Sequence, residues 1–211
     1  MIKVDQNAYK YLSGWLTDLP DFLHSIEIKN ICFDSRQISE GDCYVALPSV
    51  ANNEAVYIEA AIEKGAVLVV CGQSITHEFS CKKLAIKNVM DLSGRLIHQY
   101  LGAVTQDMKV IGVTGTNGKS SITYYLAQVL HALKMPCAVM GTVGYGDWNN
   151  LQVSGMTTLP LEKLHHVLQS LSGNNKAVAI EVSSHGLEQQ RLAGVEFESA
   201  IFSNLHSSTG C

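Results

Sequence analysis

A glycine-rich turn at residues 115–120 combines residue types that can hold a phosphate group. Glycine permits backbone conformations that let a ligand approach closely, and the successive N–H groups of such a turn can point at one anion. The positive end of a following helix would add to this attraction. Lys119 can reach the terminal phosphates of a nucleotide, and the hydroxyl of Ser120 can bind Mg²⁺. The candidate phosphate-binding residues are Gly115, Thr116, Asn117, Gly118, Lys119 and Ser120.

The turn departs from the strict phosphate-loop pattern G-x-x-x-x-G-K-[ST], because Val113 stands where the pattern requires its first glycine. The alternative is a tight strand-to-helix turn with an exposed lysine. That alternative does not explain why glycines, lysine and serine gather at the place where α/β topology favours a ligand. We therefore interpret the turn as a variant phosphate loop.

A second informative stretch, residues 177–191, carries a carboxylate at the end of an apolar strand. A carboxylate is seldom placed there without a partner, and beside a phosphate loop the natural partner of Glu181 is Mg²⁺. Arg191 suits a phosphate or carboxylate, because its planar guanidinium binds two oxygens. Ser184 and His185 could suggest a nucleophile and its base, but the G-x-S-x-G pattern is absent and neighbours on a strand point to opposite faces. The alternative for His185 is an ordinary polar residue packing at the strand end.

Three further features have more than one interpretation. Thr157 and Thr158 precede a proline at an expected helix start, so N-capping is the alternative to ligand contact for one of them. The glycine cluster at 141–146 resembles a reversed dinucleotide-binding pattern but does not open a helix, so it is interpreted as a flexible loop at a strand end. The cysteines and histidine within 71–81 lack a fourth ligand and a close C-x-x-C pair, so the sequence does not favour a metal site there.

Alternating strands and helices from residue 109 onward predict a parallel sheet with helical crossovers. The strands are near-continuous apolar runs, as expected when helices cover both faces of the sheet. Ligands of such sheets bind at the carboxyl ends of the strands, which is where the candidate residues fall. The expected strands are 109–113, 137–141, 177–182 and 199–203, and the expected helices are 119–134, 160–172 and 185–192.

The first hundred residues predict a smaller α/β unit. Helices are expected at 6–17, 55–65 and 89–102, and strands at 30–35, 42–47, 66–70 and 83–87. A break at 103–108 is interpreted as a linker. We therefore expect an α/β protein with a small substrate domain at 1–104, followed by a partial phosphate-loop domain with a parallel sheet at 105–211.

Composition excludes several classes of protein. The 211 residues carry a formal net charge of −4, so there is no global basic field for nucleic acid. The six cysteines are scattered, which is typical of reduced thiols. No apolar leader and no run of about 18 apolar residues is present, so we expect a cytoplasmic protein without membrane insertion.

These motifs resemble those of the Mur ligases. The likeness rests on GVTGTNGKSS (112–121), GMTTL (155–159), EVSSHGLEQQR (181–191) and FDSRQISEGDCYVALP (33–48). The EVSSHGL segment resembles the members that add a diamino acid as the third residue of the peptidoglycan peptide. The phosphate loop alone would indicate only the superfamily.

The resemblance implies three domains: one for the UDP end of the substrate, a central ATPase, and a third that carries the incoming amino acid. ATP would phosphorylate the terminal carboxylate of UDP-MurNAc-L-Ala-D-Glu, and the amine of meso-diaminopimelate or lysine would attack the acyl phosphate. Mg²⁺, lysine and loop amides would offset the repulsion between the carboxylate and ATP. Holding both substrates in line would supply much of the remaining rate.

The resemblance also implies residue roles. Lys119 and Glu181 would be catalytic, and Ser120 and Glu181 would position Mg²⁺. The implied ATP-binding residues are Gly115, Thr116, Asn117, Gly118, Lys119, Ser120 and Ser121. The implied substrate-binding residues are Thr157, Thr158, Ser183, Gln189 and Arg191 for the sugar–peptide, with Phe33 and Ser35 near the uridine.

The chain departs from the family in three places. Met156 stands where the family usually has asparagine, and the segment 49–56 lacks the usual glycine-containing sequence, so no uracil contact is assigned to it. After IFSNL the chain reads HSSTGC at 206–211 instead of continuing into an aspartate–histidine motif and a metal-binding lysine. We therefore expect a fragment with at most weak nucleotide binding and no ligase turnover. We also expect a monomer.

Three alternatives remain open at this point. A folylpolyglutamate synthase shares the fold, but the EVSSHGL segment and the N-terminal DSR…GD pattern argue against it. A non-catalytic nucleotide- or UDP-sugar-binding module would keep the fold without turnover. A generic phosphate-loop ATPase would not need the N-terminal unit.

Overall fold

The computed structural model describes residues 1–48 and 53–205. The chain divides into two compact units, Met1–Ser93 and Gly94–Cys211. The functional boundary expected between residues 104 and 105 stays a prediction. No helix in the described ranges combines the length and the apolar character that crossing a membrane requires. Part of the 49–56 segment and all of the HSSTGC tail lie outside the described residues.

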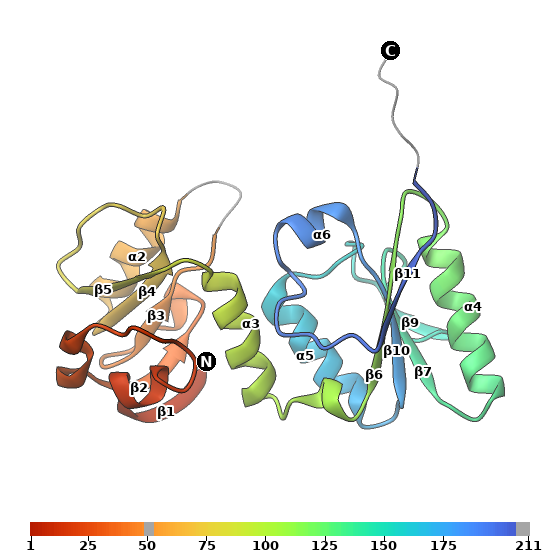
Figure 1. Ribbon diagram of the computed structural model, residues 1–211, viewed down its shortest axis with the longest axis horizontal. Helices are drawn as coiled ribbons and strands as arrows, with labels where there is room; N and C mark the ends of the chain where they lie inside the picture. The colour runs from red at the N-terminus through yellow and green to blue at the C-terminus, as the bar shows by residue number, and fades with distance from the viewer. Residues whose placement is uncertain (49–52, 206–211) are drawn as a thin grey trace, which may run out of the picture. The chain divides into compact units, whose positions relative to one another are not determined.

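The first unit is built on a five-stranded sheet in the order β1-β2-β3-β4-β5 (Figure 1). β1 pairs antiparallel with β2, and the other neighbours are parallel. The strands are β1 (Ile2–Asn7), β2 (Glu27–Cys32), β3 (Cys43–Val45), β4 (Leu68–Gly72) and β5 (Lys82–Ile86). The helices are α1 (Ala8–Leu12), α2 (Glu54–Glu63) and α3 (Val89–Tyr100), which continues into the second unit, with 3₁₀ turns η1 (Asp21–Ser25) and η2 (Ser35–Gln37).

The chain start differs from the expectation. The helix predicted from residue 6 is wrong there, because β1 occupies Ile2–Asn7 and the helix runs only from Ala8 to Leu12. The side chain of Asn7 accepts the N–H groups of Tyr9 and Lys10, so it caps the helix and fixes where it begins. The strand predicted at 30–35 lies earlier, at Glu27–Cys32.

The second unit contains a six-stranded sheet in the order β11-β6-β10-β7-β8-β9. The first four strands in this order are parallel, and β8 and β9 form an antiparallel hairpin at the edge. The strands are β6 (Lys109–Thr114), β7 (Cys137–Met140), β8 (Tyr145–Asp147), β9 (Asn150–Gln152), β10 (Ala177–Glu181) and β11 (Ser199–Phe202). The helices are α4 (Lys119–Ala132), α5 (Leu161–Ser172) and α6 (Ser184–Glu188), with the 3₁₀ turn η3 (Val104–Gln106). The predicted parallel α/β fold is confirmed.

Helices cover both faces of this sheet, which explains its near-continuous apolar strands. Figure 1 shows α4 and α5 on opposite sides of the strands. Residues of β10 alternate between the two cores: Val178 and Ile180 pack with Leu164 and Leu168 of α5, whereas Ala177 and Ala179 pack with Ala127 of α4. The strand order therefore holds the carboxyl ends of β6 and β10 side by side.

Two predictions in this unit need correction. The segment 141–146 was expected to be a loop, but Tyr145–Asp147 forms β8 and pairs with both β7 and β9. The helix predicted at 185–192 is the shorter α6, Ser184–Glu188. The hydroxyl of Ser183 accepts the N–H of Gly186 and fixes its start, and the helix ends before Gln190, whose φ of +51° is not helical.

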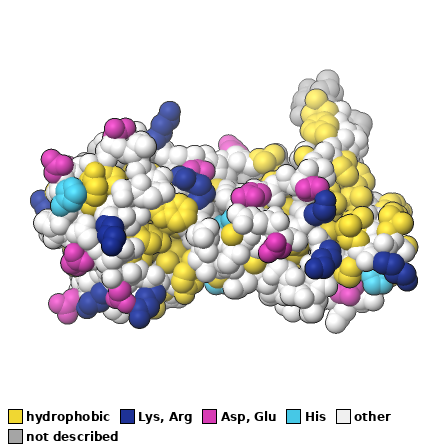
Figure 2. Space-filling model, turned by 60° about the horizontal axis from the view of Figure 1, so that its bottom comes forward, with side chains coloured by type: hydrophobic (Ala, Val, Ile, Leu, Met, Phe, Trp, Pro, Cys, Tyr) yellow, Lys and Arg dark blue, Asp and Glu magenta, His cyan; other side chains and the backbone are white. Residues whose placement is uncertain are grey.

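On the face shown in Figure 2, acidic and basic side chains are interspersed. This distribution agrees with the small formal net charge of −4. No single-sign field that would attract a polyanion is visible on that face.

Candidate nucleotide and substrate site

The glycine turn leads from the end of β6 into the start of α4. Gly115 and Gly118 have φ angles of +127° and +83°, a region that side chains other than glycine rarely adopt. Gly118 is the N-cap of α4 and provides no side-chain cap. The first N–H groups of α4 therefore have no partner within the helix and lie at its positive end. An anion at this point would satisfy both the N–H groups and the helix dipole.

The side chain of Lys119 lies across this turn. Its Nζ donates to the carbonyl oxygens of Gly115 at 2.7 Å and Thr116 at 3.2 Å. An ammonium group has three N–H donors, so one is left to meet another oxygen. The turn therefore places the ammonium group of Lys119 beside the uncapped start of α4. A nucleotide phosphate would need such a positive charge there.

Two residues after β11, which the sequence analysis did not select, brace the turn. The side-chain oxygen of Asn204 accepts the N–H of Asn117 at 3.0 Å, and its carbonyl oxygen accepts that of Thr116 at 3.2 Å. The hydroxyl of Ser203 donates to the carbonyl of Asn117 at 2.7 Å. A Cβ at Gly115 would lie 2.2 Å from Oγ of Ser203, so glycine is required there. The only signal in the sequence was the polar Ser-Asn pair directly after an apolar strand.

Glu181 ends β10 beside this turn. It is in register with Val113 of β6, two residues before Gly115. The residue is 2% exposed. Its Oε1 accepts the N–H of Thr142 at 3.1 Å, and its Oε2 accepts the hydroxyl of Thr142 at 2.9 Å. Parallel strands thus bring the buried carboxylate and the glycine turn to the same edge of the sheet. This carboxyl edge is where open α/β sheets bind their ligands.

The surroundings of Glu181 fit a divalent cation. Among the residues that the structure describes, no lysine, arginine or histidine forms an ion pair with it. A buried carboxylate is rarely left without a cationic partner. After the two bonds from Thr142, each carboxylate oxygen keeps a lone pair, because an ionised carboxylate offers about four acceptor positions. Oxygen donors of this kind are those that Mg²⁺ prefers.

The two threonines before α5 do not cap it. The N-cap of α5 is Pro160, which makes no side-chain cap, so the N-capping alternative is wrong. Instead, Oγ1 of Thr157 lies 3.0 Å from Oγ1 of Thr142. The hydroxyl of Thr158 donates to the backbone carbonyl of Glu181 at 3.1 Å. Both threonines therefore connect to the residue that ends β10.

Ser183 and Arg191 complete this cluster from the other side. Oγ1 of Thr158 accepts the N–H of Ser183 at 3.0 Å and lies 3.0 Å from its hydroxyl. The guanidinium of Arg191 donates to the carbonyl of Thr158 at 2.8 Å and to the side-chain oxygen of Gln189 at 2.9 Å. The structure thus brings together all five residues predicted to contact the sugar–peptide.

The remaining predicted residues lie elsewhere. His185 is exposed on α6, so the alternative of a polar residue packed at the strand end is wrong. Met156 is 38% exposed next to the two threonines. Phe33 and Ser35 belong to the first unit, where Ser35 is buried at the start of η2 and Phe33 is half-buried. Their role near a uridine stays a prediction.

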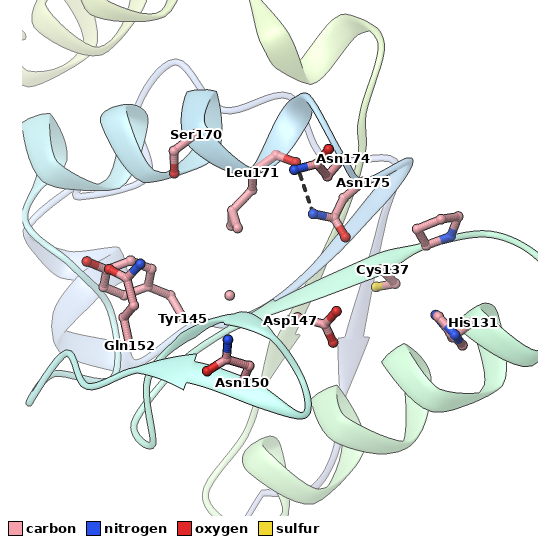
Figure 3. Close-up of a pocket in the computed structure, with 12 residues that line it drawn as sticks. His131, Cys137, Tyr145, Asp147, Asn150, Gln152, Ser170, Leu171, Asn174 and Asn175 are labelled. Carbon is pink, nitrogen blue, oxygen red and sulfur yellow. Dashed lines mark hydrogen bonds between the residues drawn. The ribbon is translucent and has the colours of Figure 1, made fainter.

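A separate polar pocket of about 380 Å³ lies in the second unit (Figure 3). Cys137, the first residue of β7, lines it together with Asp147 and Asn150 of the β8–β9 hairpin and Asn175 after α5. Because β7 starts there, the pocket lies at the amino edge of the parallel strands, whereas the glycine turn at 115–118 lies at the carboxyl edge. None of the predicted site residues lines this pocket.

Comparisons with known proteins agree with this geometry. Residues 113–208 match the family model described as Mur ligase middle domain. A UDP-N-acetylmuramoyl-L-alanyl-D-glutamate–2,6-diaminopimelate ligase of Chromobacterium violaceum is 36% identical over 201 residues, which cover 90% of this chain and 41% of that protein. The enzyme of the same name from Neisseria meningitidis serogroup A is 41% identical over 177 residues, covering 82% of this chain and 36% of its own length.

A solved structure of a ligase with that name superposes with a TM-score of 0.71 at 29% identity, covering 97% of this chain and 42% of the other. The chain thus spans about two fifths of the length of the relatives that it matches. Both units take part in this likeness, since the aligned region extends well beyond the segment matched by the family model. The chain belongs to the Mur ligase family.

Proposed function

We propose that the chain forms the nucleotide and sugar–peptide sites of an ATP-dependent ligase that adds 2,6-diaminopimelate to UDP-N-acetylmuramoyl-L-alanyl-D-glutamate. The names of the relatives support this substrate and this amino acid. The activity is a proposal because the chain spans only about two fifths of those proteins. Lysine as the added residue is the other choice within the same reaction.

The observation that carries the proposal is the position of Glu181 beside the glycine turn. Strand register places this buried carboxylate next to the last residues of β6, which lead into the turn at 115–118. A carboxylate that attacks ATP must approach a second anion, so the site needs concentrated positive charge. Glu181 and Ser120 would hold Mg²⁺, which neutralises charge on the phosphates when it is bound.

The residues of the chain then divide the remaining work. The N–H groups at the start of α4 and Lys119 would bind the β- and γ-phosphates and stabilise charge on the transferring phosphoryl group. Arg191 would hold an anionic group of the sugar–peptide through the N–H donors that Thr158 and Gln189 do not use. Fixing the carboxylate of the substrate in line with ATP makes the transfer effectively intramolecular.

The cellular setting is part of the proposal. ATP and a UDP-sugar are cytoplasmic metabolites, and the five cysteines in the described part of the chain are free thiols. We therefore place the reaction in the cytoplasm and expect a monomer that acts on small molecules. The domain boundary between residues 104 and 105 belongs to the same proposal.

Nucleotide titrations of the 211-residue chain test the proposal. Lys119→Met should weaken Mg·ATP binding by about tenfold or more, since hydrogen bonds from a charged group contribute about 1.5–3 kcal/mol. Lys134→Met is the matched control, because it removes the same charge just beyond the other end of α4. Binding of UDP-N-acetylmuramoyl-L-alanyl-D-glutamate should be unchanged in both variants. If Lys119→Met bound Mg·ATP as the unmodified chain does, the assignment of the turn would be wrong.

The same titrations separate the second candidate, a module that binds only the UDP-sugar. That reading requires binding of the sugar–peptide with no ATP binding at all. Under that reading, neither the buried carboxylate of Glu181 nor the uncapped start of α4 would have a ligand. Saturable, Mg²⁺-dependent ATP binding would exclude it.

A further inference from the structure

We infer that Thr142 is a positioning residue that orients the carboxylate of Glu181 and couples it to Thr157 in the sugar–peptide site. The inference rests on the proposed function, because it assigns a role within that site. Thr142 follows β7 in the turn that leads to β8. It lies within the glycine cluster at 141–146, for which the sequence predicted a loop and no role in the site. Its contacts in the folded chain carry the argument.

Thr142 supplies both hydrogen bonds that the carboxylate of Glu181 receives from the described residues. The backbone N–H binds Oε1 at 3.1 Å and the hydroxyl binds Oε2 at 2.9 Å. Two donors from one residue fix the carboxylate plane, which a single bond would leave free to rotate. The free lone pairs are thereby held in one direction, as a ligand of Mg²⁺ must be.

The preceding residue shows how closely the turn approaches the carboxylate. A Cβ built on Gly141 would lie 2.1 Å from Oε1 of Glu181. Only glycine lets the backbone pass at this distance and place the N–H of Thr142 on the carboxylate. The absence of a side chain at residue 141 is therefore a condition for the bond between Thr142 and Glu181.

The directions of the hydrogen bonds follow from the chemistry of the groups. An ionised carboxylate only accepts, so the hydroxyl proton of Thr142 is used on Glu181. The hydroxyls of Thr142 and Thr157 are 3.0 Å apart, and Thr157 must then be the donor. With its proton committed to Thr142, Thr157 can offer only lone pairs to a ligand. The N–H of a substrate amide or the O–H of a substrate hydroxyl can therefore donate to Thr157. A substrate carboxylate does not fit there, because it can only accept hydrogen bonds.

This chain of bonds joins the metal side of the site to the sugar–peptide side. It runs from Glu181 through Thr142 to Thr157, residues brought together from the ends of β10, β7 and the segment before α5. If the hydroxyl of Thr142 turned away from Glu181, its bond with Thr157 would also change. Thr142 therefore links the orientation of the carboxylate to the acceptor character of Thr157.

Three variants test the inference. Thr142→Val keeps the shape of the side chain and the backbone N–H but removes the hydroxyl, whereas Thr142→Ser restores the hydroxyl. Ser154→Ala is the matched control, because the hydroxyl of Ser154 bonds to the carbonyl of Gly141 at 3.0 Å and so holds the same turn without touching Glu181. Circular dichroism and the melting temperature would establish that each variant is folded.

The readout is the Mg²⁺ concentration that gives half-maximal enhancement of ATP binding, with Mn²⁺ binding by electron paramagnetic resonance as a second measure. Thr142→Val should raise this concentration by about tenfold, equivalent to about 1.4 kcal/mol, and leave ATP binding without metal within about twofold. Thr142→Ser and Ser154→Ala should stay within about twofold of the unmodified chain.

Each outcome has a distinct meaning. An unchanged Mg²⁺ requirement in Thr142→Val, or an equal rise in Ser154→Ala, would overturn the role of Thr142 while leaving the proposed function intact. If the unmodified chain showed no metal dependence of ATP binding, the proposed function would be refuted and the positioning role with it. The inference would also be contradicted if Thr142→Ser needed as high a Mg²⁺ concentration as Thr142→Val.

Discussion

Acidification should destabilise the second unit through one buried histidine. His165 on α5 is 1% exposed, and its Nε2 lies 2.8 Å from the carbonyl oxygen of Ala193. A neutral ring with its proton on Nε2 donates to this carbonyl. Burial lowers the pKa of His165 from 6.5 to about 4, and the nearby rings of His98 and His166 act in the same direction, while the bond to Ala193 opposes them.

The sign of the effect follows from the lowered pKa. In the unfolded chain His165 takes up a proton below about pH 6.5, whereas in the folded chain it does so only below about 4. Its contribution to the free energy of unfolding is therefore complete above the first value and lost as the pH falls towards the second. The drop in pKa, at about 1.36 kcal/mol for each pH unit, corresponds to about 3 kcal/mol. The pKa of His98 is also lowered, chiefly by burial, so its contribution has the same sign.

Urea unfolding at several pH values between about 7.5 and about 4.5 measures this contribution. His165→Gln keeps an N–H donor for the carbonyl of Ala193 but cannot take up a proton. Between these pH values the variant should lose about 2–3 kcal/mol less than the unmodified chain. His131→Gln, on the exposed side of α4, is the control and should follow the unmodified chain. Parallel pH profiles for His165→Gln and the unmodified chain would refute the reasoning.

Three further predictions concern the site itself. Gly141→Ala should raise the Mg²⁺ requirement of ATP binding by more than about tenfold, since its Cβ would meet Oε1 of Glu181 at 2.1 Å; metal titration would show this. Asn204→Ala should weaken ATP binding about threefold to tenfold, since the N–H of Asn117 loses its acceptor and the turn loosens; calorimetric titration measures the change. Arg191→Lys should weaken binding of the sugar–peptide about tenfold while leaving ATP binding without metal unchanged, because lysine cannot donate to Thr158, Gln189 and a ligand with one planar fork; competition binding would detect it.

Local patterns were sufficient for the elements whose environment is uniform. The strands β6, β7 and β10 lie between two helical layers, so their apolar runs identified them. β1 was missed because its residues alternate with charged and polar ones in IKVDQN, and the adjacent helical spacing suggested that the helix began earlier. The β8–β9 hairpin was missed because Gly144 and Gly146, with φ angles of +155° and +131°, resemble loop residues until the edge strand pairs them.

Some residues of the candidate site could be recognised by their type in the sequence, whereas others are recognised only from their contacts in the folded chain. Lys119 and Glu181 could be selected because a lysine in a glycine turn and an acid ending an apolar strand are unusual in themselves. Thr142 and Asn204 are ordinary loop residues whose partners lie 39 and 87 positions away in the sequence. Their roles depend on pairing through space, which no local pattern contains.

Glu181 is held at both its side chain and its backbone by neighbouring hydroxyl groups. Thr142, itself bonded to Thr157, binds the carboxylate, while Thr158 binds the carbonyl oxygen of the same residue at 3.1 Å. Of the adjacent threonines, Thr157 therefore acts on the carboxylate of Glu181 through Thr142, and Thr158 acts on its backbone carbonyl. Arg191 in turn donates a hydrogen bond to the carbonyl of Thr158. Since these bonds form one network around a buried charge, each depends on the others more strongly than isolated pairs would. Binding of the sugar–peptide at Arg191 and of the cation at Glu181 would then be linked through the threonines.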